Sequence, residues 1–115
     1  MPCQLFGIHG DALHLRNRRI GMIASNIANA ATPGYKARDL DFAQALKARG
    51  AGAGASAAVD AATRYRLPAM DSLDGNTVEM ATEQLAFSEN AVSYATTLEF
   101  IKGRVETVTR ALRGE

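Results

Sequence analysis

The sequence has little of several residue types on which small stable domains depend. Its 115 residues include one cysteine, no tryptophan and only 6% aromatic residues. A lone Cys3 excludes a disulfide within the chain and a multi-cysteine zinc site. Apolar residues make up 47% of the chain, but many of them are alanine, so a large core is hard to build. A compact enzyme is therefore disfavoured.

The sequence also lacks a charge excess and a long hydrophobic run. Thirteen Lys and Arg face twelve Asp and Glu, for a net charge of +1, which gives no overall attraction to nucleic acid or anionic lipid. No apolar run approaches the ~20 residues that cross a bilayer. The first twenty residues contain Asp11, two histidines and three arginines, where a secretory signal needs an apolar core. We expect no membrane span, no nucleic-acid partner and no cleavable signal peptide.

Three regions differ in composition. Residues 1–35 are predicted to hold an N-terminal helix and a turn, residues 36–75 a mostly irregular segment, and residues 76–115 a second long helix. Within the middle, residues 50–58 alternate Gly and Ala, which have little to bury and much backbone entropy to lose, so we expect a flexible loop there. The expected fold is all-α, with the two terminal helices paired as a coiled-coil-like antiparallel bundle.

The C-terminal region carries the clearest periodicity. Apolar residues follow a heptad spacing of alternating three and four residues, the seam of a long helix. Asn76 with Glu79 is typical of a capping box at the helix start, and Gly114 is typical of its end. The seam consists of Phe87, Ala91, Tyr94, Leu98, Ile101, Val105, Val108 and Leu112.

The N-terminal region shows two apolar stripes at helical spacing, which imply two neighbours for one helix. One stripe contains Leu5, Ile8, Ala12, Leu15 and Met22, and the other contains Leu13, Ile20, Ile23 or Ala24, and Ile27. We expect one stripe to face the C-terminal helix and the other to be covered by a second molecule. Three amides, Asn26, Asn29 and Asn90, are expected to make hydrogen bonds between helices that set their register.

A turn is predicted where the N-terminal helix stops near Ala31. In the sequence Thr32-Pro33-Gly34-Tyr35, Pro and Gly occupy the two central positions of a type II turn. We expect this turn, together with the second N-terminal stripe, the three amides and the C-terminal seam, to form the subunit interface.

No constellation favours catalysis, a cofactor or a metal. His9 and His14 are five residues apart, which does not place them on one helical face as a spacing of four would. The acidic residues Glu79, Glu83 and Glu89 are expected to be solvated near the helix start. The small basic patch of Arg16, Arg18 and Arg19 is expected to form salt bridges with another subunit.

Two segments resemble the bacterial flagellar axial family of rod, hook and hook-associated proteins. SNIANAATPGYKARDLDF, residues 25–42, resembles the N-terminal signature of that family, and DGNTVEMATEQLAFSENAVSYATTLEFIKGR, residues 74–104, resembles the C-terminal signature of one proximal rod member. Together they cover nearly half of the chain. The Gly-Ala tract matches no pattern of the family.

The resemblance implies a structural, non-enzymatic subunit of the proximal rod of the flagellar basal body, stacked with copies of itself and other rod subunits into a hollow tube through the periplasm. It also implies contact with the base of the basal body and its export gate, and delivery by the flagellar type III export apparatus. Two alternatives from other classes remain open: a helical adaptor or chaperone of export, and a small DNA-associated helical protein. Another proximal rod subunit is the nearest alternative within the family.

Overall fold

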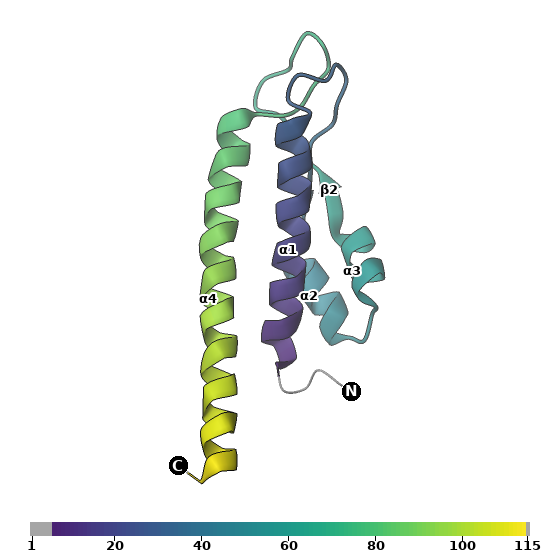
Figure 1. The fold of residues 1–115 in the computed structure, drawn as a ribbon. Coiled ribbons are helices and arrows are strands. Elements are labelled where there is room, and N and C mark those ends of the chain that lie inside the picture. The colour runs from purple at the N-terminus through teal and green to yellow at the C-terminus, as the bar shows by residue number, and fades with distance from the viewer. Residues whose placement is uncertain (1–5, 115) are drawn as a thin grey trace.

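Two long helices form the body of the structure, a computed structural model that describes residues 6–114. Helix α1 covers Gly7–Ala28 and helix α4 covers Met80–Arg113. They lie side by side, and the chain ascends through α1 and descends through α4 (Figure 1). The molecule is elongated, with extents of 65 × 26 × 18 Å. None of the helices within residues 6–114 combines the length and apolar character that crossing a membrane requires.

The middle of the chain is folded, which corrects the expectation of a mostly irregular segment. It consists of strand β1 (Arg38–Leu40), helix α2 (Phe42–Gly50), helix α3 (Ala55–Ala62) and strand β2 (Thr63–Tyr65). The two strands pair antiparallel, with Asp39 opposite Arg64. The protein is therefore mostly helical but carries a small sheet, so the all-α expectation is wrong at this point. The second half of the Gly-Ala tract forms the first turn of α3.

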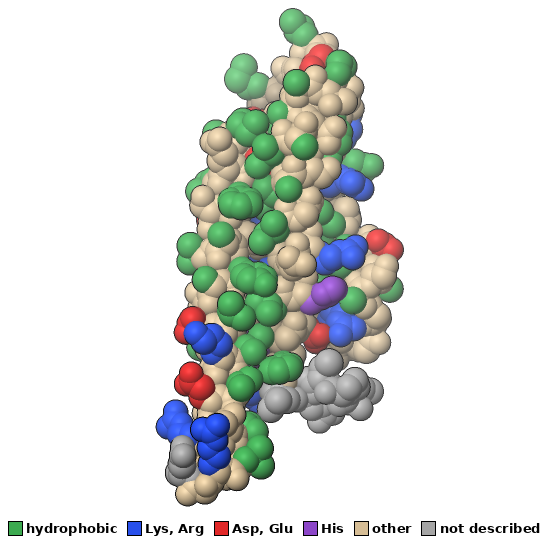
Figure 2. All heavy atoms as spheres, viewed as in Figure 1, with side chains coloured by type: hydrophobic (Ala, Val, Ile, Leu, Met, Phe, Trp, Pro, Cys, Tyr) green, Lys and Arg blue, Asp and Glu red, His purple; other side chains and the backbone are tan. Residues whose placement is uncertain are grey.

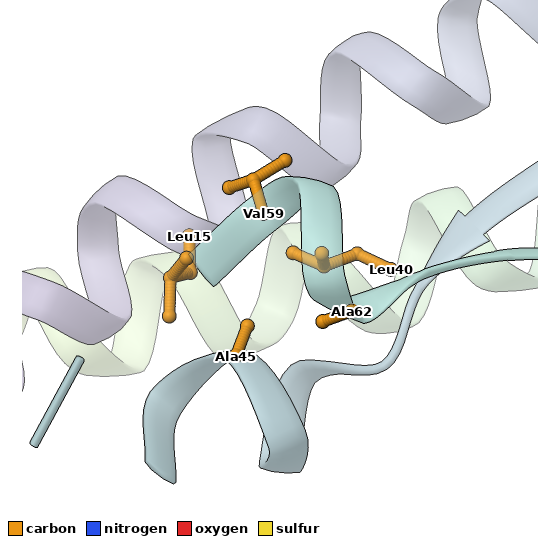
Figure 3. Packing of buried hydrophobic residues seen from close by; sticks show 5 residues of the cluster. All are labelled: Leu15, Leu40, Ala45, Val59 and Ala62. Carbon is orange, nitrogen blue, oxygen red and sulfur yellow. The ribbon is translucent and has the colours of Figure 1, made fainter. Parts of the chain in front are cut away.

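A small hydrophobic core holds this middle segment against α1. Its buried side chains come from α1, β1, α2 and α3 (Figure 3). They are Leu15, Leu40, Ala45, Val59 and Ala62, with Met22, Phe42 and Leu46 packed against them. Alanine has almost no side-chain entropy to lose on burial, and its small side chain lets α2 and α3 approach closely. The alanine content that argued against a large core therefore builds a small one.

The turn after α1 has the predicted geometry. The Tyr35 amide donates to the Thr32 carbonyl at 3.2 Å, and Gly34 has a φ of +76°, which a type II turn requires at its third position. The helix itself ends at Ala28, three residues earlier than expected, and Asn29 is its C-terminal cap.

The capping box predicted at the start of α4 is wrong, because α4 begins at Met80 and the side chain of Glu79 makes no capping bond. Asn76 instead caps the other helix. Its Nδ2 lies 2.8–3.0 Å from the carbonyl oxygens of Asn29, Ala30 and Thr32, so it binds the C-terminal cap residue of α1 and the turn that follows it. The predicted end of α4 is confirmed, with Gly114 in the left-handed conformation.

Candidate assembly surface

The face of α4 that packs against α1 is largely polar. Four side chains of α4 are buried: Glu83, Ala86, Asn90 and Thr97. Three of them, Glu83, Asn90 and Thr97, follow one another at intervals of seven residues. This spacing forms one stripe along a helix, so the contact inside the chain is a polar stripe and not the apolar seam.

Glu83 is fully buried, which contradicts the expectation that it is solvated. Its Oε1 lies 3.0 Å from Arg66 Nε, and its Oε2 accepts a hydrogen bond of 3.1 Å from Asn26 Nδ2. A buried carboxylate is costly unless it is paired and hydrogen-bonded. The partners of Glu83 come from α1 and from the residue after β2, so this group connects α4 to both other parts of the molecule.

An ion network extends from Glu83 through Arg66 to Asp39 and Arg19. Arg66 Nη2 lies 3.1 Å from Asp39 Oδ2, and Arg19 binds both oxygens of Asp39 at 2.8 and 2.9 Å. Burial raises the pKa of Asp39, but the hydrogen bonds and charge of Arg19, with the Leu40 amide and Arg66, lower it overall. Hydrogen bonding to Asp39 raises the pKa of Arg19 against the opposing effect of burial.

The basic patch on α1 therefore has partners within the chain. Arg19 binds Asp39, and the Arg16 guanidinium lies 4.0 Å from the centre of the Phe42 ring, a cation–π distance. Arg18 is exposed. For Arg19, an intrachain salt bridge replaces the one that we expected with another subunit, whereas Arg16 contacts an aromatic ring and forms no salt bridge among the described residues.

The three amides behave differently from one another. Asn26 Oδ1 accepts a hydrogen bond from the Arg38 amide, and Asn26 Nδ2 donates one to the Arg38 carbonyl. Asn26 therefore joins α1 to β1 as well as to Glu83. Asn90 Nδ2 donates to the Arg16 carbonyl across the helix pair at 3.0 Å. The side chain of Asn29 bonds only locally, to Ser25 and Thr32. Asn26 and Asn90 are each 1% exposed and so do not face a second molecule in this conformation.

The apolar seam lies beside the polar stripe, displaced by about one residue around the helix. Four of its large side chains, Phe87, Leu98, Val105 and Val108, are 38–43% exposed, and Leu112 is 84% exposed. Ala91 is exposed, whereas Tyr94 and Ile101 are half-buried. Figure 2 shows hydrophobic side chains along the whole length of α4 on one face of the molecule.

The last part of α4 extends beyond the described part of α1. The stacking of His9 on Phe100, with 5.2 Å between ring centres, lies near the first turn of α1. From Lys102 to Gly114, every residue except the half-buried Thr109 is exposed. The seam residues of this extension, Val105, Val108 and Leu112, therefore belong to a helix with little cover from the described residues.

The predicted α1 residues divide between two neighbours within the same chain. Leu15 and Met22 pack on the middle segment, Ile23 is fully buried, and Leu13, Ile20 and Ile27 are half-buried. The expectation that one stripe needs a second molecule to cover it is thus corrected by the folded middle segment. Leu5 and Cys3 lie outside the described residues.

The predicted turn is only partly accessible. Thr32, Pro33 and Gly34 are exposed and Tyr35 is half-buried, with its hydroxyl 3.1 Å from Ser25 Oγ. The exposed part of the turn lies at the end of the molecule where the segment before α4 returns, since the Gly34 amide donates to the Asp74 carbonyl at 2.8 Å.

Sequence reasoning missed two residues that organise this surface, Asp39 and Arg66, and it assigned Asn76 to the cap of the wrong helix. Each is polar and has partners far away in the chain, so no local pattern identifies it. The sequence did contain one signal for the inner face of α4. Glu83, Asn90 and Thr97 form a polar heptad that runs beside the apolar one. No group of three His, Cys, Asp or Glu within residues 6–114 could hold a metal ion.

A long helix pair with a partly exposed apolar seam is typical of a protein that completes its packing in an assembly, and the comparisons with known proteins agree. The family described as "Flagella basal body rod protein" matches residues 7–36, which are α1 and the turn after it. The class is thus that of the flagellar rod proteins.

Relatives over nearly the full length narrow this class. The flagellar basal body rod protein FlgB of Cereibacter sphaeroides is 47% identical, over 95% of this chain and 94% of its own length. FlgB of Aeromonas hydrophila is 41% identical (96% and 93%), and FlgB of Escherichia coli K12 is 38% identical (90% and 88%). The chain belongs to the FlgB family of flagellar basal body rod proteins.

Proposed function

We propose that the chain is a structural subunit of the proximal rod of the bacterial flagellar basal body and polymerises through its terminal helices into the hollow shaft used for motility. Membership of the FlgB family supports the assignment to the rod. The observation that carries the polymerisation is the seam of α4, which presents apolar side chains over a 34-residue helix.

The energetics of the seam favour association. A continuous exposed apolar surface marks a site of interaction, and full burial of a large apolar side chain contributes about 1.5–3 kcal/mol. Four of the seam side chains are already more than half buried, so each stands to contribute about 1 kcal/mol on association. The two terminal helices act as a coiled-coil-like antiparallel pair whose seam faces neighbouring subunits.

The partners of the proposed subunit follow from its place in the rod. They are further copies of this chain, other rod subunits and the base of the basal body with its export gate. Delivery is by the flagellar type III export apparatus to the periplasmic rod. The proposed role is structural and not catalytic.

Replacement of a seam residue by a charged one tests the polymerisation. In cells that depend on this protein, Leu98→Asp or Ile101→Asp is expected to abolish rod assembly, seen as loss of swimming and of basal-body rods in electron micrographs. Synthesis and export of the subunit should continue. Ser88→Asp is the matched control, because Ser88 is an exposed residue of the same helix outside the seam. Normal swimming of the Leu98→Asp cells would contradict the proposal.

The size of the complexes formed by purified protein distinguishes the adaptor alternative. A rod subunit is expected to form open-ended assemblies that grow with concentration, whereas an adaptor forms a complex of defined size with its client. Sedimentation of the purified chain over a range of concentrations, alone and with candidate rod partners, separates the two.

A further inference from the structure

A second surface of the molecule is an open groove where α1, α2 and α4 meet. Its volume is about 370 Å³, within the range of protein sites that hold ligand groups. Five of its lining side chains are large and apolar or aromatic: Ile8, Phe42, Leu46, Val92 and Phe100. Ile8, Val92 and Phe100 are exposed. The groove is separate from the seam, because none of the seam residues lines it.

Arg16 is the one Asp, Glu, Lys or Arg among the described residues that line the groove. Its Nε is buried and has no hydrogen-bond partner, and burial together with the charge of Arg19 lowers its pKa. A carboxylate brought into the groove would pair with this guanidinium and return the hydrogen bonds that it lost on burial. The groove thus favours an apolar segment that carries negative charge.

The loop between β2 and α4 has the complementary composition. Three large apolar side chains, Leu67, Met70 and Leu73, are almost fully exposed. They alternate with Asp71 and Asp74, and residues 67–74 contain no Lys or Arg. The carboxylate of Asp74 is bound within the loop by Ser72 and the Asn76 amide, whereas Asp71 has no such bond among the described residues. Asp71 is therefore the carboxylate available to Arg16.

The loop and the groove lie at opposite ends of α1 and cannot meet within one chain. Asp74 and Asn76 anchor the loop beside the C-terminal end of α1, whereas Ile8, Ala12 and Arg16 line the groove in its N-terminal half. From Ala12 to Ala28 the helix rises about 24 Å. We propose that the loop of residues 67–74 of one copy docks into the groove between α1, α2 and α4 of a second copy, with Asp71 facing Arg16.

Such a contact joins two different surfaces, so it leaves a free loop at one end of a pair and a free groove at the other. Contacts of this kind produce open chains or helical filaments when the rotation does not close a ring. The inference rests on the proposed function, since both concern assembly, but it assigns an end-to-end contact that the lateral seam does not provide.

Disulfide trapping between copies tests the docking. In full-length protein carrying Cys3→Ser, one preparation bears Leu73→Cys and another bears Phe100→Cys, and the two are mixed at high concentration under mild oxidation. A cross-linked dimer is expected from the mixture. Leu73→Cys mixed with Leu85→Cys is the matched control, because Leu85 is exposed to a similar degree but does not line the groove. Equal yields with both partners, or no dimer with either, would overturn the inference.

A charge exchange tests the role of Arg16 and Asp71. Arg16→Glu in the Phe100→Cys preparation is expected to lower the cross-link yield about tenfold, an electrostatic penalty of about 1.4 kcal/mol. Asp71→Arg in the Leu73→Cys preparation should restore most of it, with helix content checked by circular dichroism. Failure of this rescue, with both proteins folded, would also count against the docking. If trapping fails while Leu98→Asp still blocks rod assembly, the end-to-end contact is wrong and the proposed function stands.

Discussion

The two faces of α4 that run side by side along the helix differ in composition and in what covers them. The inner face meets α1 through Glu83, Asn90 and Thr97, which are buried. The outer seam carries Phe87, Leu98 and Val105, which stay substantially exposed. A buried polar group tolerates only the partner that satisfies it, whereas apolar contact is non-directional.

This difference supports our proposal that folding and assembly use separate surfaces of one helix. The polar residues of the inner face determine which residues α4 contacts on α1 and on the middle segment. They contribute modestly to the stability of the fold. The outer face carries apolar surface that is exposed to water in the free subunit. We therefore expect inner-face substitutions to change the free energy of unfolding, and seam substitutions to change association.

The inner face should be most sensitive to loss of the Glu83 partner. Arg66→Met leaves a fully buried carboxylate without its guanidinium, and breaking a buried ion pair in this way costs about 3–5 kcal/mol. Urea denaturation followed by circular dichroism should show a fall of this size in the free energy of unfolding. Lys102→Met is the control, because Lys102 and Glu99 form an exposed pair, and a change within about 0.5 kcal/mol is expected. Similar losses for both variants would contradict the difference between the two faces.

The core beside the inner face should respond next. Leu15→Ala removes a fully buried side chain from the cluster that joins α1 to α2 and α3, and such cavities cost about 2–5 kcal/mol. The same denaturation experiment should show it, accompanied by faster proteolysis of residues 42–65. If the variant stays stable and resistant, the middle segment is held by something other than this cluster.

The cap at the end of α1 should have an intermediate effect. Asn76→Ala removes the donor to three carbonyl oxygens and the acceptor of the Val78 amide. We expect a loss of about 1–3 kcal/mol, with faster amide exchange confined to residues 29–37. Asn29→Ala, which removes only local side-chain bonds, should cost less, and the reverse order would show that Asn29 carries the cap.

The ion network should affect how the free energy of unfolding falls at acid pH. The pKa of Asp39 is lower in the folded protein than its ordinary value, so its contribution is fully present above the unfolded pKa of about 3.9 and disappears as the pH falls through the folded value. Asp39→Asn should flatten the decrease of the unfolding free energy below about pH 5. An unchanged slope in that range would mean that Asp39 contributes little to acid sensitivity.

The seam should give the smallest effect on stability. Val105→Thr lies on the extension of α4 with little cover, and a change within about 0.5 kcal/mol is expected for the isolated subunit. Its effect should appear in sedimentation instead, as a shift of assembly to higher protein concentration. A large loss of stability without a change in association would reverse the roles assigned to the two faces.

Local features of the fold were predictable because they depend on neighbours in the sequence. The periodicity from Phe87 to Leu112 predicted one long helix, Gly114 its end, and Pro33-Gly34 the turn. The middle segment was not predictable, because α3 and the small sheet depend on packing against Leu15 and pairing with each other, and the Gly-Ala tract alone resembles a flexible loop.

The sequence by itself determined that this protein has two long terminal helices with apolar stripes and the signatures of a flagellar rod subunit, since helical periodicity and turn chemistry are local properties. Only the tertiary structure decided which face of α4 meets α1. That choice depends on Glu83 finding Asn26 and Arg66, 57 and 17 residues away, because a buried carboxylate is stable only where such partners converge. The apolar seam is thereby left partly exposed, as the proposed assembly requires.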